Sequence, residues 1–561
     1  MKLFKTNQST ISTSTSLMVL LLLGGVIQQD MNMKHHRPNG SSIYVAAKGG
    51  SDKKGGKDDS GSSTILEVDD SGAGDYLTLQ EAVDAASPGD TIVVNEYTTN
   101  LKGWQVQLTI DKEGLTIIGG EGKSKPIIKA VDAPKKDDEH GDKRKEENMK
   151  KSQKLESLFT SRKFLTEQHC PKVILDGCIS GTDQCGQDII TIDAPDVTIE
   201  NFFFRHGEII LTDNAHNTVI ANNCFWGDTD FLIKPPTKNF ANPKSTLHDV
   251  TIEGNFFQGG RKNTIYINGD NHIVRNNAFV TVHEGITVDG DSNSIIGNAF
   301  VGCSDICIQY NNGLDGVITD NTILYSKNGI EYYRKTTGGS VIVDYNVIKG
   351  VSEEGIYARC VLKYSDAGCV SGSISYNHII GSGGSDPKIG TLRANNFDVK
   401  YNDIYYGSYE GLYIDGNDNT IQGNIVSRHG VDSTYCSNIR VIGDDNEIIE
   451  NESYFSTYDG IVQEDGNGNM YRRNVIRGSG RAGIEVQGED EIILEENIIE
   501  DGQGEGIAVV GGVNHVIVNN ELTNNRIDIC WGTYVPTDGS TFNDNTYETG
   551  GIDTSCEVVV Y

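Results

Sequence analysis

The feature that most constrains the fold is an asparagine that returns at nearly regular intervals along most of the chain. Eleven of the fourteen intervals span 21 to 25 residues, and three longer ones follow Asn223, Asn346 and Asn424. A self-similar period of this length is the signature of a repeat architecture. The recurring residues are Asn201, Asn223, Asn255, Asn277, Asn298, Asn321, Asn346, Asn377, Asn402, Asn424, Asn451, Asn474, Asn497, Asn520 and Asn545.

Each repeat holds three short stretches in which apolar and polar residues alternate. A typical unit is "GIEVQGEDEIILEENII" at 483–499, which starts with Gly-Ile and reaches the asparagine before its third stretch. Strands this short can bury their apolar side chains only by stacking on copies of themselves. We therefore predict an all-β chain that folds as a right-handed single-stranded parallel β-helix, a solenoid. A leucine-rich repeat would show leucine and helical spacers, and the chain shows neither.

The asparagine itself has a predicted place in this solenoid. We expect it at a sharp bend, where a left-handed backbone is tolerated. There, its side-chain amide can bond the same amide one coil away, so that the asparagines form a ladder.

The N-terminal part of the chain predicts export. Residues 1–27 contain the apolar run "SLMVLLLLGGVI" after two lysines, which is typical of a signal peptide, with a signal anchor as the alternative. Residues 28–64 are rich in Gly, Ser, Lys and Asp and predict a disordered linker. The β-helix should occupy residues 65–560, with a helix over 77–86 and a charged insertion at about 133–165.

The charge and the cysteines agree with export. The chain has 79 acidic and 47 basic residues, a net charge of −32, and such a surface repels nucleic acid and anionic membranes. Eleven cysteines without a Cys-x-x-Cys pair predict disulfides, with Cys178/Cys185 and Cys360/Cys369 as loop staples and at least one thiol left over. We expect a secreted monomer that contacts no membrane once the signal is cleaved.

The repeat, together with "GDYLTLQEAVDAASPGDTIVV" at 74–94, resembles the pectate-lyase-like superfamily of right-handed β-helix proteins. The second stretch looks like the capping helix and first strand that those proteins share. The resemblance covers about residues 65–560 and implies a carbohydrate ligand. It does not imply one reaction, because the superfamily includes lyases, hydrolases, esterases, epimerases and adhesins without activity.

No catalytic signature of a single family is complete. "GDTDFLIK" resembles part of a pectin methylesterase motif around Asp230, but the remainder of that motif is missing. Arg-His-Gly occurs at Arg205 and at Arg428, as in some lyases, but out of register, which favours turn residues. Lys388 in "SDPKIG" stands where alginate epimerases carry their histidine.

The repeat register predicts a polar face. When the coils are aligned on the Ile of Gly-Ile, the residues one and three positions later point outward. The first row contains Tyr266, Thr287, Cys307, Glu331, Tyr357, Tyr413, Arg440, Val462, Glu485 and Ala508. The second row contains Lys234, Asn268, Asp289, Gln309, Tyr333, Arg359, Asp415, Glu464 and Gln487, and we expect Arg393 to join it. Tyrosine and arginine on an exposed sheet suit sugar stacking and uronate pairing, although solvated sheets also carry such residues.

The middle coils give the candidate catalytic residues. Arg359 can neutralise a uronate carboxylate, with Arg393 as a second candidate. Tyr333 or Tyr357 can act as base or acid if a neighbouring arginine lowers its pKa, and Glu331 can orient these groups. The candidate substrate-binding residues are Tyr413, Asp415, Tyr266 and Arg440.

A row of turn aspartates predicts calcium. Asp270, Asp291 and Asp490 precede the recurring asparagine by seven residues, and Asp418 and Asp445 by six. Carboxylates stacked at coil spacing repel one another, and calcium would relieve this. The alternative is that each aspartate bonds its own turn.

Two functions therefore stay open. The first is a carbohydrate-active enzyme, a polysaccharide lyase or a uronate C5-epimerase that acts on an acidic polysaccharide. The second is a non-catalytic secreted protein of the cell wall or matrix that binds glycan. The middle coils favour the first, and the incomplete catalytic signatures favour the second.

Overall fold

The structure is a computed structural model of the 561-residue chain. It describes residues 63–96, 104–105, 107–120, 149–150, 153–154, 170–176, 187–227, 233–234, 245–334, 340–360, 372–382, 391–430, 436–487, 490–532, 539–548 and 551–554. All but four of these residues, 149–150 and 153–154, lie in the solenoid. The predicted signal peptide, the linker and most of the charged insertion lie outside the described residues.

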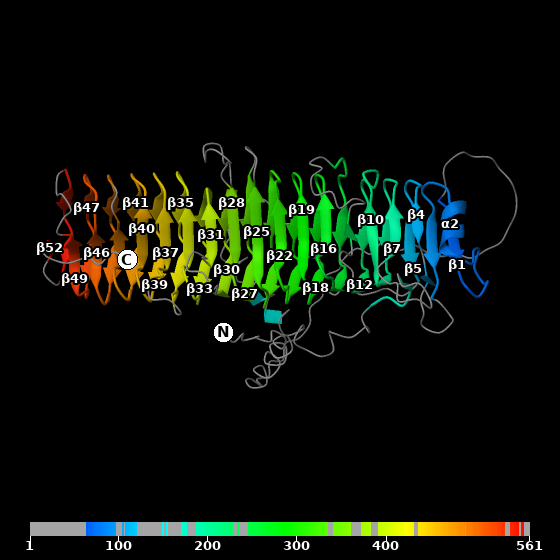
Figure 1. The fold of residues 1–561 in the computed structure, drawn as a ribbon, viewed down its shortest axis with the longest axis horizontal. Coiled ribbons are helices and arrows are strands. Elements are labelled where there is room, and N and C mark those ends of the chain that lie inside the picture. Colours follow the sequence, from blue (N-terminus) through cyan, green and yellow to red (C-terminus); the bar gives the residue numbers. More distant parts are fainter. Residues whose placement is uncertain are drawn as a thin grey trace, which may run out of the picture. The chain divides into compact units, whose positions relative to one another are not determined.

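The described chain is a parallel β-solenoid (Figure 1). Each coil contributes one strand to each of three parallel sheets, which we call A, B and C. In one coil these strands are β17 (Ile273–Arg275), β18 (Ala278–Val280) and β19 (Glu284–Asp289). Each strand pairs in parallel with its counterpart in the next coil, as β17 does with β20 (Ser294–Ile296). The prediction of a parallel β-helix is confirmed.

Sheet C has the longest strands and presents the face that the sequence analysis singled out. Its strands along the candidate region are β16 (Asn263–Asn268), β19, β22 (Ile306–Asn311), β25 (Asn328–Arg334), β28 (Ile356–Cys360), β31 (Leu392–Asn395), β34 (Leu412–Asp415), β37 (Ile439–Ile442), β40 (Ile461–Asp465) and β43 (Ile484–Val486). They pair in this order, so the face is continuous from one coil to the next.

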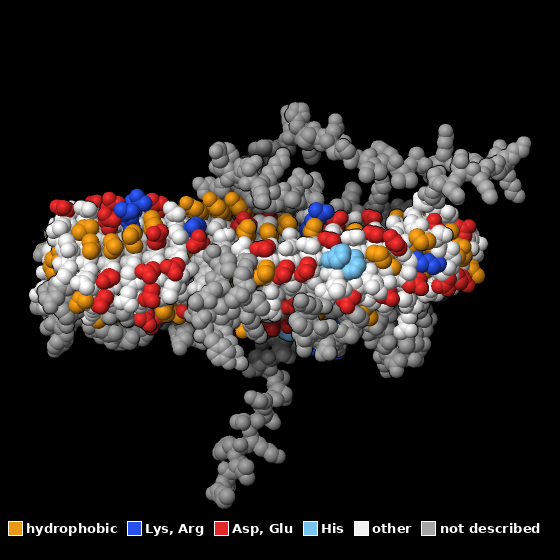
Figure 2. Space-filling model, turned by 90° about the horizontal axis from the view of Figure 1, so that it is seen from above, with side chains coloured by type: hydrophobic (Ala, Val, Ile, Leu, Met, Phe, Trp, Pro, Cys, Tyr) orange, Lys and Arg blue, Asp and Glu red, His pale blue; other side chains and the backbone are white. Residues whose placement is uncertain are grey.

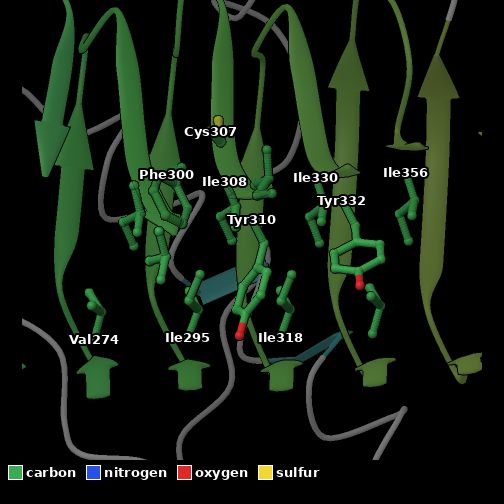
Figure 3. Packing of buried hydrophobic residues seen from close by; sticks show 14 of the residues in the cluster. Val274, Ile295, Phe300, Cys307, Ile308, Tyr310, Ile318, Ile330, Tyr332 and Ile356 are labelled. Carbon is green, nitrogen blue, oxygen red and sulfur yellow. The ribbon is translucent and has the colours of Figure 1, made fainter. Parts of the chain in front are cut away.

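The interior is filled by equivalent side chains stacked coil on coil. Phe204, Phe225, Phe257, Phe279 and Phe300 form a row whose successive ring centroids are 4.5–4.8 Å apart. This spacing matches the separation of paired strands, so each ring lies flat on the next. Figure 3 shows how Ile, Val, Tyr and Phe side chains of neighbouring coils meet in the core. The alternating pattern that predicted the solenoid therefore corresponds to one continuous core.

The turn from sheet A to sheet B carries the asparagine ladder. The ladder runs from Asn223 to Asn545, and from Asn255 onward each Oδ1 accepts the backbone N–H and the Nδ2 of the preceding asparagine, at 2.9–3.1 Å. Each Nδ2 also donates to a sheet A carbonyl of the preceding coil, as Asn277 does to Ile252. The predicted ladder is confirmed.

Two details of that prediction are wrong. The left-handed residue is the one before the ladder position, for example Asn276 at φ 56° and Tyr345 at φ 54°. Asn201, at φ 68°, occupies this earlier position, and Phe202 lies opposite Asn223. The ladder therefore begins one coil later than the sequence suggested, because either residue of the turn can be asparagine.

A short helix lies at the N-terminal end of the solenoid. Helix α2 (Leu79–Ala85) begins at Thr78, whose side chain accepts from Glu81 N–H while the Glu81 carboxylate accepts from Thr78 N–H. This capping box satisfies two free backbone donors. Leu79, Ala82 and Val83 are buried against the first strands, which confirms the predicted capping helix.

Among the described residues, disulfides join Cys170 to Cys224 and Cys303 to Cys307. Cys530 is also disulfide-bonded, and Cys436 keeps a buried thiol, as the odd cysteine count required. The predicted Cys178/Cys185 and Cys360/Cys369 staples involve residues outside the described side chains. No helix among the described residues is both long and apolar enough to cross a membrane.

Candidate functional site

The register of sheet C defines the outward rows. The first row runs Tyr266, Thr287, Gln309, Glu331, Tyr357, Arg393, Tyr413, Arg440, Val462, Glu485 and Ala508. Two positions differ from the expectation. Gln309, not Cys307, belongs to this row, since Ile308 pairs with Ile286 and Ile330. Arg393 also lies in this row and not in the second one.

The displacement at Cys307 has a simple cause. "DICIQY" offers Ile306 and Ile308, and because side chains alternate with a period of two, either can be aligned with the Ile of Gly-Ile. Cys307 is fully buried and bonded to Cys303, so it cannot contribute to the outer surface.

We call the outward side chains of β25, β28, β31 and β34 the central face. They are Glu331, Tyr333, Tyr357, Arg359, Arg393, Asn395, Tyr413 and Asp415. Figure 2, a view of one side of the molecule, shows acidic side chains spread along the surface and basic ones in only a few places. The two arginines of the central face are therefore unusual for a chain with a net charge of −32.

Arg393 lies between two tyrosine rings. Its Cζ is 5.1 Å from the ring centroid of Tyr357 and 4.9 Å from that of Tyr413. Such cation–π contacts hold the guanidinium plane against the rings. The N–H groups of a guanidinium point along its plane, so stacking leaves their direction suited to a carboxylate ligand.

Arg359 stands beside the same tyrosine. It is exposed, and its NH1 donates to the Tyr357 phenol oxygen at 3.1 Å. Tyr333 is its direct neighbour on β25, because Tyr333 and Arg359 are paired across the two strands. The structure thus brings together Arg359, Tyr357, Tyr333 and Arg393, which the sequence analysis selected as a group.

Glu331 lies at the N-terminal side of this group. Its carboxylate accepts from Gln309 Nε2 at 3.1 Å, and burial raises its pKa, with the charge of Asp305 adding to the rise. Asp305 belongs to a second group with His283 and Glu284, whose ligand atoms lie within 4.8 Å of one another. Burial also raises the pKa of Glu284, and Asp305 and Glu331 add to it. These residues could hold a cation, and the sequence analysis missed them because they flank the strands.

The remaining substrate-binding candidates are distributed along sheet C. Tyr266 is three coils before Glu331, and its hydroxyl donates to Asp289 at 2.8 Å. Tyr413 lies on β34, the last strand of the central face, and is largely buried, with Arg393 over its ring. Asp415 adjoins β31, where Asn395 Nδ2 donates to the Asp415 carbonyl. Tyr413 and Asp415 therefore lie with the central group, and Tyr266 does not.

Arg440 is tied to two carboxylates. Its NH1 donates to Glu410 at 2.8 Å, and its Nε donates to Glu464 at 2.7 Å. Glu410 is fully buried, and burial raises its pKa although Arg440 opposes the rise. The sequence signal for Glu410 was an acidic residue directly before Gly and an apolar residue, as also in "YDGI" at Asp459.

The five predicted calcium aspartates occupy two turn positions. Asp270, Asp291 and Asp490 each accept a backbone N–H from the next coil through Oδ1, at 2.8–2.9 Å. Asp418 and Asp445 lie one position later, at φ 57° and 54°. Asp270 and Asp291 are adjacent in the first row, and Asp418 and Asp445 are adjacent in the second. The bonds of the first row link each aspartate to the next coil, whereas the alternative to calcium in the sequence analysis had each aspartate bond its own turn.

The two Arg-His-Gly segments are turns. Arg205 forms an ion pair with Asp176, and His206 is left-handed at φ 57°. Arg428 is itself left-handed at φ 61°. Asp230 and Lys388, from the other incomplete motifs, lie outside the described residues.

Two family models match parts of the chain. Residues 388–551 match the model described as a right handed beta helix region. Residues 237–366 match the model described as the periplasmic copper-binding protein NosD. No curated protein sequence matches the chain.

Solved structures with the same kind of fold are similar only at low identity. The catalytic unit of a GH87 α-1,3-glucanase from Streptomyces thermodiastaticus is 12% identical over 65% of this chain, with a TM-score of 0.29, and the chain covers 61% of its length. The A-module of the mannuronan C-5 epimerase AlgE4 from Azotobacter vinelandii is 11% identical, with coverages of 82% and 94% and a TM-score of 0.27. A PL6 family polysaccharide lyase from Pseudopedobacter saltans is 12% identical, with coverages of 88% and 94% and a TM-score of 0.22.

Proposed function

This chain is a right-handed parallel β-helix protein, and from that premise we propose that it is a secreted enzyme acting on an acidic polysaccharide. The reaction is a lyase elimination or a C5 epimerisation of a uronate, and the central face is the active site. The observation that carries the proposal is the contact group of Arg359, Arg393, Tyr357 and Tyr333 on one outward surface.

Both reactions begin with loss of the proton next to a uronate carboxyl group. The carboxylate must first be neutralised, because a second negative charge develops on it as the proton leaves. Arg359 is exposed and its guanidinium can bind a carboxylate with two N–H groups. Arg393 provides a second cation, held in a fixed orientation between Tyr357 and Tyr413.

The phenols provide the proton transfer. The Tyr357 phenol oxygen accepts a hydrogen bond from Arg359 NH1 and lies on the outward surface, so we assign Tyr357 as the base that takes the C5 proton. In a lyase the C4–O bond breaks, a C4–C5 double bond forms and Tyr333 protonates the leaving oxygen. In an epimerase the C4–O bond stays, and Tyr333 returns a proton to the opposite face of C5.

The flanking residues bind the polymer. Tyr413 and Asp415 border the reacting unit, while Tyr266 and Arg440 lie further along sheet C and contact sugar units outside it. Polymer binding along the strand-stacking direction is supported by the continuous pairing of the coils.

A divalent cation fits this function. His283, Glu284 and Asp305 combine one imidazole with two carboxylates, a donor set that suits transition metals as well as calcium. The segment that matches the copper-binding protein model includes these residues. A cation there would offset the mutual repulsion of Glu284, Asp305 and Glu331. The turn aspartates Asp270, Asp291, Asp418, Asp445 and Asp490 remain a second predicted calcium site.

The alternative is a secreted glycan-binding protein without activity. The incomplete catalytic signatures favour it, and so do the existing partners of Arg440 and Arg393, which suit fixed recognition surfaces. The two functions differ in one measurable way. An enzyme exchanges the C5 proton of its polymer with solvent or eliminates across C4–C5, and a binding protein does neither.

The deciding experiment incubates the purified protein with alginate, pectate and glycosaminoglycan polymers in deuterated water. Ultraviolet absorbance reports the double bond of a lyase product, and NMR reports deuterium at C5 for an epimerase. Deuterium or unsaturation on one polymer is the expected result. Tight binding with neither signal would favour the alternative.

A further inference from the structure

The turn from sheet B to sheet C has one left-handed residue in nearly every coil, directly after the sheet B strand. Glycine or a short polar residue is the usual occupant of such a position, since a β-carbon costs about 1 kcal/mol there. Gly350, Gly381 and Gly478 follow this rule, at φ 64–69°. Three successive coils between Gly381 and Gly478 break it.

Those coils carry Tyr406, Arg428 and Phe455, at φ 61°, 61° and 53°. They follow β33 (Asp403–Tyr405), β36 (Ile425–Ser427) and β39 (Glu452–Tyr454). Tyr406 is 52% exposed and Phe455 is 57% exposed, so neither ring contributes to the core. Two exposed aromatic rings therefore stand at backbone positions that are strained for residues with a β-carbon.

The guanidinium of Arg428 lies between the two rings. Its Cζ is 5.2 Å from the centroid of Tyr406 and 5.7 Å from that of Phe455, and its NH1 donates to the Tyr406 hydroxyl at 2.8 Å. Successive coils are about 4.8 Å apart, so the two rings are separated by roughly 10 Å along the solenoid. This spacing leaves a face of each ring open on either side of a central cation.

Arg428 differs from the other arginines of these coils in its charge environment. Arg440, Arg473 and Arg477 each form an ion pair with glutamate. In the described part of the chain, Arg428 forms none. An arginine without a carboxylate partner on so acidic a protein is available to an external anion.

The adjoining residues of sheet B extend the aromatic surface. Tyr405 and Tyr454 directly precede Tyr406 and Phe455, and the rings of Tyr454 and Phe455 are 6.4 Å apart. Burial raises the pKa of both phenols to about 12. They therefore stay protonated and neutral at physiological pH.

We propose that Tyr406, Arg428 and Phe455, with Tyr405 and Tyr454, form a binding track for an anionic polysaccharide, separate from the central face. The rings stack on the apolar faces of sugar units, and Arg428 pairs with a carboxylate or sulfate on the unit between them. The track goes beyond the proposed activity, because it lies on the B–C turn and binds polymer whether or not the central face is catalytic.

The test is affinity electrophoresis of the full chain in gels that contain alginate, a sulfated glycosaminoglycan or neutral dextran. Arg428→Asn and the double variant Tyr406→Asn/Phe455→Asn keep residues that accept a left-handed backbone. Arg473→Asn is the matched control, because it removes the same charge from another left-handed turn position, at φ 53°. We expect both track variants to weaken retardation by an anionic polymer about tenfold or more, which corresponds to 1.4 kcal/mol. Arg473→Asn and the wild type should behave alike, and dextran should retard none of them.

If Arg473→Asn weakened the retardation as much as Arg428→Asn does, the effect would come from net charge alone, and the binding track would be refuted. Unchanged retardation of the track variants would also overturn it, as would a change in oligomeric state, which would mark a protein contact. The same gels run in an Arg359→Ala background separate this proposal from the first. If the wild type binds a polymer through Arg428 but turns over no polymer, the activity is refuted and the track is kept. If the wild type turns over short oligosaccharides and Arg428→Asn does not change the retardation by polymer, the track is refuted and the activity is kept.

Discussion

The A–B turn and the central face belong to the same coils and differ in almost every respect. At the turn, one residue type repeats from Asn223 to Asn545, and from Asn255 to Asn520 it is almost fully buried and makes the same hydrogen bonds to its asparagine neighbours each time. On the central face, each coil presents a different side chain, and the contacts are made once. The comparison shows that different parts of one coil have different roles. The repeated turn fixes the register of the coils, and the outward positions of sheet C can therefore vary in sequence.

The largest effect should follow from a break in the ladder. Asn346 is fully buried, and its side chain bonds Asn321, Asn377 and the Ile318 carbonyl. In Asn346→Ala, buried backbone groups lose their partners, and we expect a loss of about 3–5 kcal/mol in the free energy of unfolding, measured in urea. Asn417→Ala is the control, because Asn417 is exposed and caps only Asp444 N–H, so it should lose less than about 1 kcal/mol. Similar losses in both variants would contradict the account of the ladder.

The opposite behaviour is expected on the central face. Arg359→Ala removes an exposed side chain, so its unfolding free energy should stay within about 0.5 kcal/mol of the wild type. Its turnover of the uronate polymer should fall by a factor of about 100 or more, because the developing charge is no longer neutralised. Arg473→Ala, which breaks an ion pair with Glu450 away from this face, should keep full turnover. An active Arg359→Ala variant would move the site away from this arginine.

Arg393 should combine the two behaviours. It packs on Tyr357 and Tyr413, so Arg393→Gln loses two cation–π contacts, and we expect about 1 kcal/mol of destabilisation. Turnover should fall as well, through KM and kcat together, because the orientation of Tyr357 is no longer fixed. Arg393→Lys keeps the charge but not the planar group, and should recover only part of the activity. Full activity in Arg393→Gln would remove this residue from the site.

The smallest expected effect concerns pH. Burial raises the pKa of Glu331, Glu284 and Asp289 above the ordinary values of these carboxyl groups. The folded state then holds more protons than the unfolded state above these values, so stability falls as pH rises through the folded pKa. We expect Tm to decrease as pH rises from the ordinary carboxyl pKa of about 4 through the raised folded-state pKa values, and Glu331→Gln to flatten this dependence. A Tm that rises over the same interval would contradict the assignment.

The sequence predicted the solenoid and the ladder because both come from a physical requirement that repeats. Ile286, Ile330 and Ile356 occupy the same inward position in different coils, so each repeat supports the same alignment of the pattern. The exceptions are positions where two registers satisfy the pattern equally. Ile306 and Ile308 are two residues apart, and only the pairing across β19 and β25 decides between them.

The site was predicted less completely because its parts are joined by single contacts. Outward positions such as Arg359 and Tyr357 follow from alternation. The contact of Arg393 with both Tyr357 and Tyr413 depends on which coils are adjacent, and residues 383–390, directly before β31, lie outside the described residues. The metal candidates His283, Glu284 and Asp305 flank strands, where alternation gives no information about which side chains converge.

The central claim assigns different roles to two parts of each coil. The outward residues of sheet C, which differ from coil to coil, perform the chemistry, and the asparagine ladder stabilises the fold. Deuterium exchange at C5 of a uronate polymer, followed by NMR for the wild type and for Arg359→Ala side by side, tests it most directly. The account predicts deuterium in the product or unsaturation with the wild type, and neither with a folded Arg359→Ala variant. Equal exchange by both proteins, or none by either on any uronate polymer that the wild type binds, would contradict it.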